Sequence, residues 1–171
     1  MKGPSIFAHL RDIILLPFMV TVVVPWFIDG WHSDRVLWMM IVGAMSGLTG
    51  ITLLFYTIRL FGLFGEGTLA PWHPTQRLVI VGPYRYVRNP MISGVVFILV
   101  GESLFFHSVP IAGWAAFVFV LNTWYFISYE EPSLEERFGE DYRQYKKRVG
   151  RWIPTFPGTP VSNIHDTEKP A

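Results

Sequence analysis

The sequence has no cysteine among its 171 residues, and only 16% of the residues are charged. Without cysteine, the chain has no disulfide bond, no thiolate ligand for a metal and no cysteine nucleophile. Basic residues are also absent from a long stretch, because no lysine or arginine lies between Arg88 and Arg137. The formal net charge is +1. Since a nucleic-acid-binding domain presents a broad basic face, we do not expect a nucleic-acid partner.

Hydrophobic residues take the place of the missing charges and make up 51% of the chain. The longest apolar segment is long enough to cross the roughly 30 Å hydrocarbon core of a membrane. We therefore predict an all-α integral membrane protein with about four transmembrane helices. Its single domain comprises residues 1–158, and residues 159–171 form a disordered tail. The predicted spans are residues 13–28, 36–61, 91–106 and 111–129.

Local features refine the spans. The first has the length of a signal-peptide core, but Pro17 and Pro25 lie inside it and no small-residue cleavage site follows, so we interpret it as a retained span. The second carries glycines at near-helical spacing, from Gly43 to Gly50, which would permit close approach of another helix or serve simple packing. Only "HSVP" separates the last two spans, so they form a tight hairpin.

Orientation follows from the basic residues, which mark the cytoplasmic side of membrane proteins. Arg35 alone falls on the opposite side in the predicted topology. We therefore predict a multi-pass protein with both termini, and the loop between the second and third spans, in the cytoplasm. The residues on which this depends are Lys2, Arg11, Arg59, Arg77, Arg85, Arg88, Arg137, Arg143, Lys146, Lys147, Arg148 and Arg151.

The segment after the fourth span has apolar residues every three or four positions, which predicts an amphipathic cytoplasmic helix. Its apolar stripe would lie either on the membrane surface or over the cytoplasmic loop. The stripe consists of Leu134, Phe138, Tyr142, Tyr145 and Val149.

The cytoplasmic loop "LVIVGPYRYVRNPM" (residues 78–91) is rich in groups that suit a charged ligand. Asn89 is a good N-cap and Pro90 fits the first helical position, so a helix should begin here. A helix start attracts anions, and Arg85 and Arg88 add positive charge. Tyr84 and Tyr86 offer aromatic faces to organic cations or bases. Taken singly, the arginines fit positive-inside residues and the tyrosines fit an interfacial aromatic belt.

A second polar cluster, Glu130 and Glu131, ends the fourth span. The hairpin returns the chain to the same membrane face, so these acids should lie close to Asn89. Two negative charges at a helix C-terminus interact unfavourably with the helix dipole. A binding role for these acids would explain why they are placed there. They suit ribose hydroxyls, an ammonium group or a loop arginine; the structural alternative is an ion pair to Arg85 or Arg88. We expect Pro132 to break the helix there, so that the amphipathic helix turns back over the site.

Together, "RLVIVGPYRYVRNPM", a hydrophobic hairpin and "EEPSLEERFGEDYRQYKKRVGRWIP" resemble the isoprenylcysteine carboxyl methyltransferase and phospholipid N-methyltransferase group of integral membrane enzymes. The resemblance covers about residues 76–154. It implies an S-adenosylmethionine site within residues 75–154, without a soluble Rossmann-type fold. The residues that it implies for the cofactor are Gln76, Arg77, Leu78, Val79, Tyr84, Arg88, Asn89, Pro90, Met91, Ile92 and Glu131.

The sequence departs from the family pattern at three positions. Many members have His at the position of Asn89 and Tyr at that of Ile92, and asparagine takes no proton at neutral pH. Isoprenylcysteine enzymes carry an arginine where Ile127 stands. This chain therefore lacks the positive charge that would recognise the carboxylate of a prenylated substrate. If the acceptor is an amine or thiol, Glu130 is a candidate to receive its proton.

These features lead to the hypothesis of an S-adenosylmethionine-dependent methyltransferase at the membrane. Its partners would be membrane lipids and a lipid or small lipophilic acceptor that enters from the bilayer. One alternative is a membrane NADPH-dependent reductase of the sterol-reductase type, which is similar to this family in its C-terminal region. Another is a non-catalytic membrane protein, in which Tyr84, Asn89 and Glu131 could be replaced without loss of ligand binding.

Overall fold

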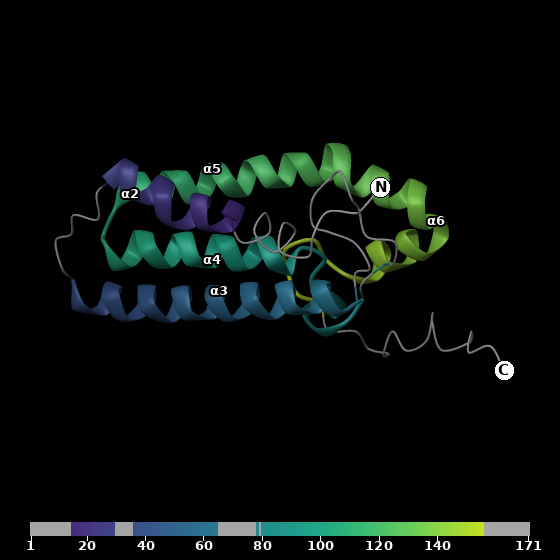
Figure 1. The fold of residues 1–171 in the computed structure, drawn as a ribbon, viewed down its shortest axis with the longest axis horizontal. Coiled ribbons are helices and arrows are strands. Elements are labelled where there is room, and N and C mark those ends of the chain that lie inside the picture. The colour runs from purple at the N-terminus through teal and green to yellow at the C-terminus, as the bar shows by residue number, and fades with distance from the viewer. Residues whose placement is uncertain (1–14, 30–35, 65–77, 79, 156–171) are drawn as a thin grey trace, which may run out of the picture.

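The structure, a computed structural model, describes residues 15–29, 36–64, 78 and 80–155. Apart from the last helix, which lies at one end of the bundle, the helices run side by side along the long axis of the molecule (Figure 1). Within the described residues the backbone is helical apart from short connections, and a lone parallel bridge joins Val87 to Gly150. The all-α prediction is therefore confirmed for this part of the chain. The main helices are α2 (Val24–Asp29), α3 (Leu37–Phe64), α4 (Pro90–Phe105), α5 (Val109–Tyr125) and α6 (Glu131–Arg148).

The first apolar segment is a helix, Leu15–Asp29, in which the turn Met19–Val23 is π-helical and continues into α2. Pro25 is buried within it. Because proline has no N–H to donate to the preceding turn, a widened turn before it accommodates the residue without ending the helix. The segment lies along α5 (Figure 1), and the Trp114 indole N–H donates to the Val20 carbonyl at 3.0 Å.

Helices α3 and α4 form the most extensive contact of the bundle, and glycines lie between them. A Cβ atom added to Gly43 would lie 2.6 Å from the carbonyl oxygen of Gly101, and one added to Gly50 would lie 2.6 Å from that of Gly94. The Ser46 hydroxyl also donates across this contact to the Phe97 carbonyl at 2.9 Å. The predicted close approach of another helix to the glycines of the second span is confirmed.

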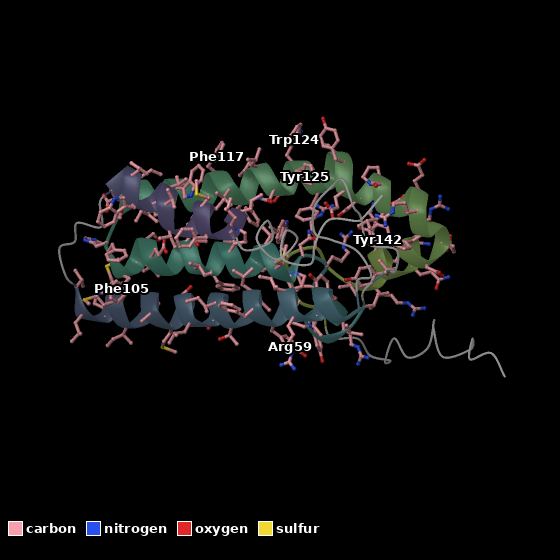
Figure 2. The ribbon with its side chains drawn as sticks, in the orientation of Figure 1. Arg59, Phe105, Phe117, Trp124, Tyr125 and Tyr142 are labelled. Atoms are coloured by element: carbon pink, nitrogen blue, oxygen red, sulfur yellow. The ribbon has the colours of Figure 1, made fainter. Side chains whose placement is uncertain are left out.

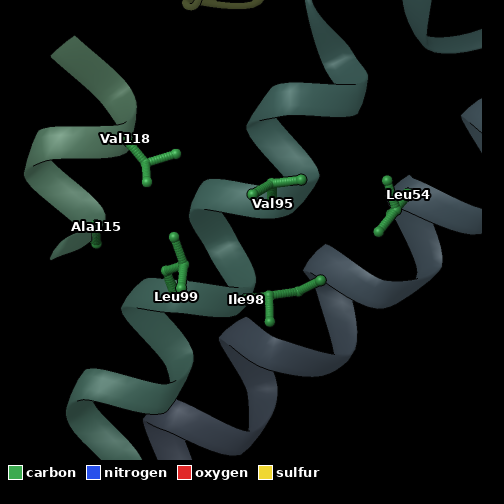
Figure 3. Close-up of a cluster of buried hydrophobic side chains, with 6 residues drawn as sticks. All are labelled: Leu54, Val95, Ile98, Leu99, Ala115 and Val118. Atoms are coloured by element: carbon green, nitrogen blue, oxygen red, sulfur yellow. The ribbon is translucent and has the colours of Figure 1, made fainter. Parts of the chain in front are cut away.

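A tight turn at His107 and Ser108 joins α4 to α5, as the short "HSVP" connection predicts. The Ser108 hydroxyl accepts the Ile111 N–H at 3.3 Å and so caps α5. The core lies between α3, α4 and α5, with Leu99 fully buried at its centre (Figure 3). Its buried members are Leu54, Val95, Ile98, Leu99, Ala115 and Val118.

The predicted break at Pro132 is wrong. Helix α5 continues through a π-helical turn, Phe126–Glu130, directly into α6. Pro132 follows this widened turn, which accommodates its missing N–H as the π-helical turn before Pro25 does, so the helix does not break there. The chain turns back seven residues later at Gly139, whose φ of 55° and ψ of −126° are open to glycine but strained for other residues.

The exterior of the bundle is apolar. Phe27 is 81% exposed, Leu37 72% and Phe55 67%, and such large side chains cover α2, α3 and α5. Among the described residues, Leu37–Leu60 and the apolar first part of Val109–Arg148 meet the length and composition needed to cross a membrane. Leu15–Asp29 and Pro90–Phe105 are shorter apolar helices. In Figure 2, Arg59 and Tyr142 lie toward the end of the bundle that holds α6, and Phe105 lies toward the opposite end.

Candidate functional site

The start of α4 and the end of α5 meet at the same end of the bundle. Arg88, just before α4, donates from Nη1 to Oε1 of Glu131, at the start of α6, at 2.9 Å. This contact joins residues that are 43 positions apart in the sequence. It places the backbone just before Asn89 and the acid pair at the same end of the bundle. Of the two loop arginines named as possible partners, Arg88 rather than Arg85 forms the ion pair with Glu131.

Glu131 is the centre of a charged network and is only 4% exposed. Its Oε1 also accepts from Nε of Arg151 at 2.7 Å, and its Oε2 lies 3.1 Å from Nζ of Lys146. Burial raises the pKa of the Glu131 carboxyl, but the hydrogen bonds from Arg151 and Lys146 and the nearby charge of Arg88 outweigh it, so the pKa is lowered overall. Glu131 is therefore an ionised anchor between the loop, α6 and the segment that follows α6.

Helix α6 packs over the loop of residues 78–91 rather than standing away from it, so its apolar stripe has the first of the two predicted placements, against the loop. Beyond the turn at Gly139, Tyr142, Tyr145 and Val149 are buried and contact Leu78 and Ile80. The Tyr145 hydroxyl donates to the Tyr84 carbonyl at 2.7 Å. Burial raises the pKa of Tyr145, so this hydroxyl keeps its proton and remains a donor.

Asn89 precedes α4 as predicted, but its side chain does not cap the helix. Its backbone carbonyl instead accepts from the N–H and the hydroxyl of Ser93, at 3.1 Å and 3.0 Å. The side-chain amide makes no hydrogen bond within the described part of the chain. The adjacent Nε of Arg88 is buried and also has no hydrogen-bond partner there. Two polar groups at the helix start thus lack a hydrogen-bond partner among the described residues.

Glu130, the candidate proton acceptor, differs from its neighbour. It is half-buried, and among the described residues it forms no ion pair. Burial raises the pKa of Glu130, and the charge of Arg137 opposes this only in part. Its carboxylate is also close enough to Tyr84 to contribute, after burial and Tyr145, to the raised pKa of that phenol. The two adjacent acids therefore have opposite pKa shifts.

The other predicted site residues occupy several environments. Tyr84 is buried against Leu60 and Val81. Pro90 is fully buried, Met91 packs against the core between the helices, and Ile92 is half-buried. Leu78 contacts α6. Gln76, Arg77 and Val79 lie outside the described residues, so their predicted position beside the cofactor stays a prediction.

A shallow hollow of about 500 Å³ lies elsewhere, between α3 and the loop. Asn89, Glu130 and Glu131 are absent from its lining. The hollow is therefore on the α3 side of the loop and is not the predicted site. Its lining residues are Leu53, Tyr56, Gly82, Pro83, Arg85, Tyr86, Val87 and Pro154.

Sequence reasoning missed the part played by residues 150–155, which we name the C-terminal segment. The Arg88 N–H donates to the Gly150 carbonyl at 2.9 Å, and the Thr155 N–H donates to the Tyr86 carbonyl at 2.9 Å. Arg151 reaches Glu131, and the Trp152 ring lies 5.0 Å from that of Phe119 in α5. The available signal was "GRWIP", which ends the stretch that resembles the methyltransferases.

Comparisons with known proteins agree with this architecture. Protein-S-isoprenylcysteine O-methyltransferases of Mus musculus and Homo sapiens are 35% and 34% identical to the chain over 91 residues, which is 51% of this chain and 31% of theirs. The chain thus spans less than a third of the length of these relatives. An uncharacterised Haemophilus influenzae protein is 40% identical over 47 residues, which is 28% of this chain and 73% of that protein.

A solved structure shares the fold. It is that of the eukaryotic intramembrane Ras methyltransferase called isoprenylcysteine carboxyl methyltransferase, with a TM-score of 0.58 over 91% of this chain and 55% of that one, at 19% identity. The sequence profile of the phospholipid methyltransferase family matches residues 38–141, which include α3, α4, α5 and the start of α6. The chain therefore belongs to the phospholipid methyltransferase family.

Proposed function

We propose that this protein is an S-adenosylmethionine-dependent methyltransferase that crosses the membrane with about four helices and modifies a lipid or small lipophilic acceptor. The observation that carries the proposal is the meeting of the α4 start with the acid pair, through the contact between Arg88 and Glu131. Family membership supports the reaction class. The apolar exterior supports a membrane location, because soluble proteins rarely expose such large apolar areas.

The available polar groups fit the cofactor. Its carboxylate would bind at the start of α4, where the side-chain amide of Asn89 and the Nε–H of Arg88, which has no partner within the described residues, would donate. The resemblance implies a place for Glu131 beside the cofactor; because three cations surround its carboxylate, we infer that it would also hold Arg88 in place. The cofactor supplies a methyl group that is already activated on a sulfonium. The protein then contributes mainly alignment and exclusion of water.

Glu130 would receive the proton that an amine or thiol acceptor releases. Its raised pKa makes it a better base near neutral pH than an exposed glutamate, provided that it is ionised when the acceptor binds. The acceptor would reach it from the bilayer between α3, α4 and α5. The termini and the cytoplasmic loop would face the cytoplasm, as the basic residues predict.

Binding of labelled S-adenosylmethionine to the purified protein tests the proposal. We expect Asn89→Ala to weaken binding at least tenfold, since it removes a donor to a charged group without breaking a contact of the fold. Gln144→Ala, at an exposed position on α6, is the matched control and should bind as wild type does. Absence of binding by the wild-type protein would refute the proposal, and binding of reduced nicotinamide instead would favour the reductase.

Methyl transfer to membrane lipid extracts tests the role of Glu130. Glu130→Gln should keep cofactor affinity but lower the transfer rate, because the amide takes no proton. The wild-type rate should rise with pH as Glu130 ionises, and this rise should be lost in the variant. Glu136→Gln, which neutralises an exposed acid on α6, should leave both the rate and its pH dependence unchanged. Separation of the labelled products would identify the acceptor.

A further inference from the structure

Trp152 occupies an unusual position for a residue beyond the last helix. The backbone on either side of it pairs with the loop, through Gly150 to Arg88 and through Thr155 to Tyr86. Its side chain instead reaches α5, with the ring centroids of Phe119 and Phe126 at 5.0 Å and 6.2 Å. The C-terminal segment therefore runs from the start of α4 to the last turns of α5.

The rings that Trp152 meets belong to the side of α5 that leads to Glu130. Phe119 and Phe126 are seven residues apart, which places them on one side of a helix. Glu130 follows Phe126 by four residues, at the end of the π-helical turn. Trp152 thus lies two residues after the backbone bond to Arg88, and its ring contacts the side of the helix that leads to Glu130.

The indole N–H of Trp152 is buried and has no hydrogen-bond partner in the part of the chain that the structure describes. A buried tryptophan usually finds an acceptor for this group, because an unmet donor costs free energy in the folded state. Trp114 shows the usual outcome, since its N–H donates to the Val20 carbonyl. An unmet donor beside the predicted site is explained if a bound ligand supplies the acceptor.

We propose that Trp152 contacts the nucleoside of the methyl donor, with Phe119 and Phe126 completing an aromatic wall for its base. This inference rests on the proposed function and adds a residue to its site. The indole N–H would donate to a nitrogen or oxygen acceptor of the nucleoside, and the ring would stack on the base. Arg88, whose backbone pairs with Gly150 of the C-terminal segment, and its neighbour Asn89 would hold the carboxylate at the other end of the ligand.

The test uses S-adenosylhomocysteine, the stable product of methyl transfer, and the full-length protein in detergent. Trp152→Phe keeps an aromatic ring but removes the N–H, and we expect it to raise Kd about three- to tenfold. Trp152→Leu also removes the stacking surface and should raise Kd about ten- to a hundredfold. Trp38→Phe, at a 62% exposed position on α3, is the control and should leave Kd unchanged.

Tryptophan fluorescence supplies a second readout that a purely structural role would not affect. Ligand binding should change the emission of wild type and of Trp38→Phe, and this change should be lost in Trp152→Phe at saturating ligand. Wild-type affinity in both Trp152 variants would overturn the inference while leaving the proposed function intact. Failure of the wild-type protein to bind the ligand would overturn both. Thermal unfolding of each variant shows whether a weaker affinity reflects a damaged fold.

Discussion

The glycine contact between α3 and α4 allows a stability prediction with an internal control. A Cβ atom at Gly101 would lie 2.6 Å from the backbone nitrogen of Gly47 and 2.7 Å from the carbonyl oxygen of Gly43. Both are backbone atoms, so no side chain can rotate away. An ordinary contact needs about 3.5 Å, so the helices would have to separate by about 0.9 Å to accept Gly101→Ala.

This separation of the helices determines how much stability Gly101→Ala loses. A radial gap of about 1 Å forfeits a quarter to a half of the dispersion energy of the contacts that it opens. We expect the lost dispersion energy and the strain of overpacking together to destabilise the Gly101→Ala variant by about 1–3 kcal/mol. Gly94→Ala should cost less, because its nearest atoms, in Gly50 and Leu54, lie at 3.0 Å and 3.1 Å. Since about 1 kcal/mol shifts Tm by about 2–4 °C at this chain length, the Gly101 variant should unfold several degrees lower.

The controls are Gly47→Ala and Gly113→Ala, at positions where an added Cβ meets nothing within 4 Å. Alanine is the better helix former, so both should be neutral or slightly more stable. The assay is thermal unfolding of the purified protein in detergent, followed by tryptophan fluorescence. If Gly47→Ala lowers Tm as much as Gly101→Ala does, or if neither variant changes it, the inferred backbone contact is incorrect.

Three further predictions concern the charged end of the bundle. Gly139→Ala should destabilise the protein by about 1–3 kcal/mol by backbone strain alone, since its Cβ would be unobstructed; circular dichroism melts measure this against Gly113→Ala. Glu131→Ala should cost about 3–5 kcal/mol because it leaves Arg88 buried without its partner, and chemical unfolding that matched wild type would contradict the network. Because folding lowers the pKa of Glu131, its stabilisation is complete above the unfolded pKa of about 4.3 and is lost as the pH falls through the folded value. Tm measured across acidic pH should therefore fall more steeply for wild type than for Glu131→Gln, and parallel curves would exclude this linkage.

Local sequence determined the helices and their spacing. The apolar runs predict the long helices, "HSVP" permits only a tight hairpin, and the glycines from Gly43 to Gly50 predict a close neighbour. The stripe from Leu134 to Val149 predicts the amphipathic α6. These features depend on residue type and periodicity within a few turns of helix. They can therefore be predicted from the sequence without information on contacts between distant residues.

The tertiary structure determined which distant residues contact one another. Glu131 takes Arg88 from 43 residues before it and Arg151 from 20 residues after it, and no local pattern singles out these arginines among the others. It also decided where the chain turns, because the π-helical turn before Pro132 lets the helix continue, whereas Gly139 adopts a φ of 55° that few other residues accept. Trp152 meets Phe119 only because that turn returns the chain to the bundle. Pairings between distant residues depend on the path of the backbone, which is why they emerge only in the folded molecule.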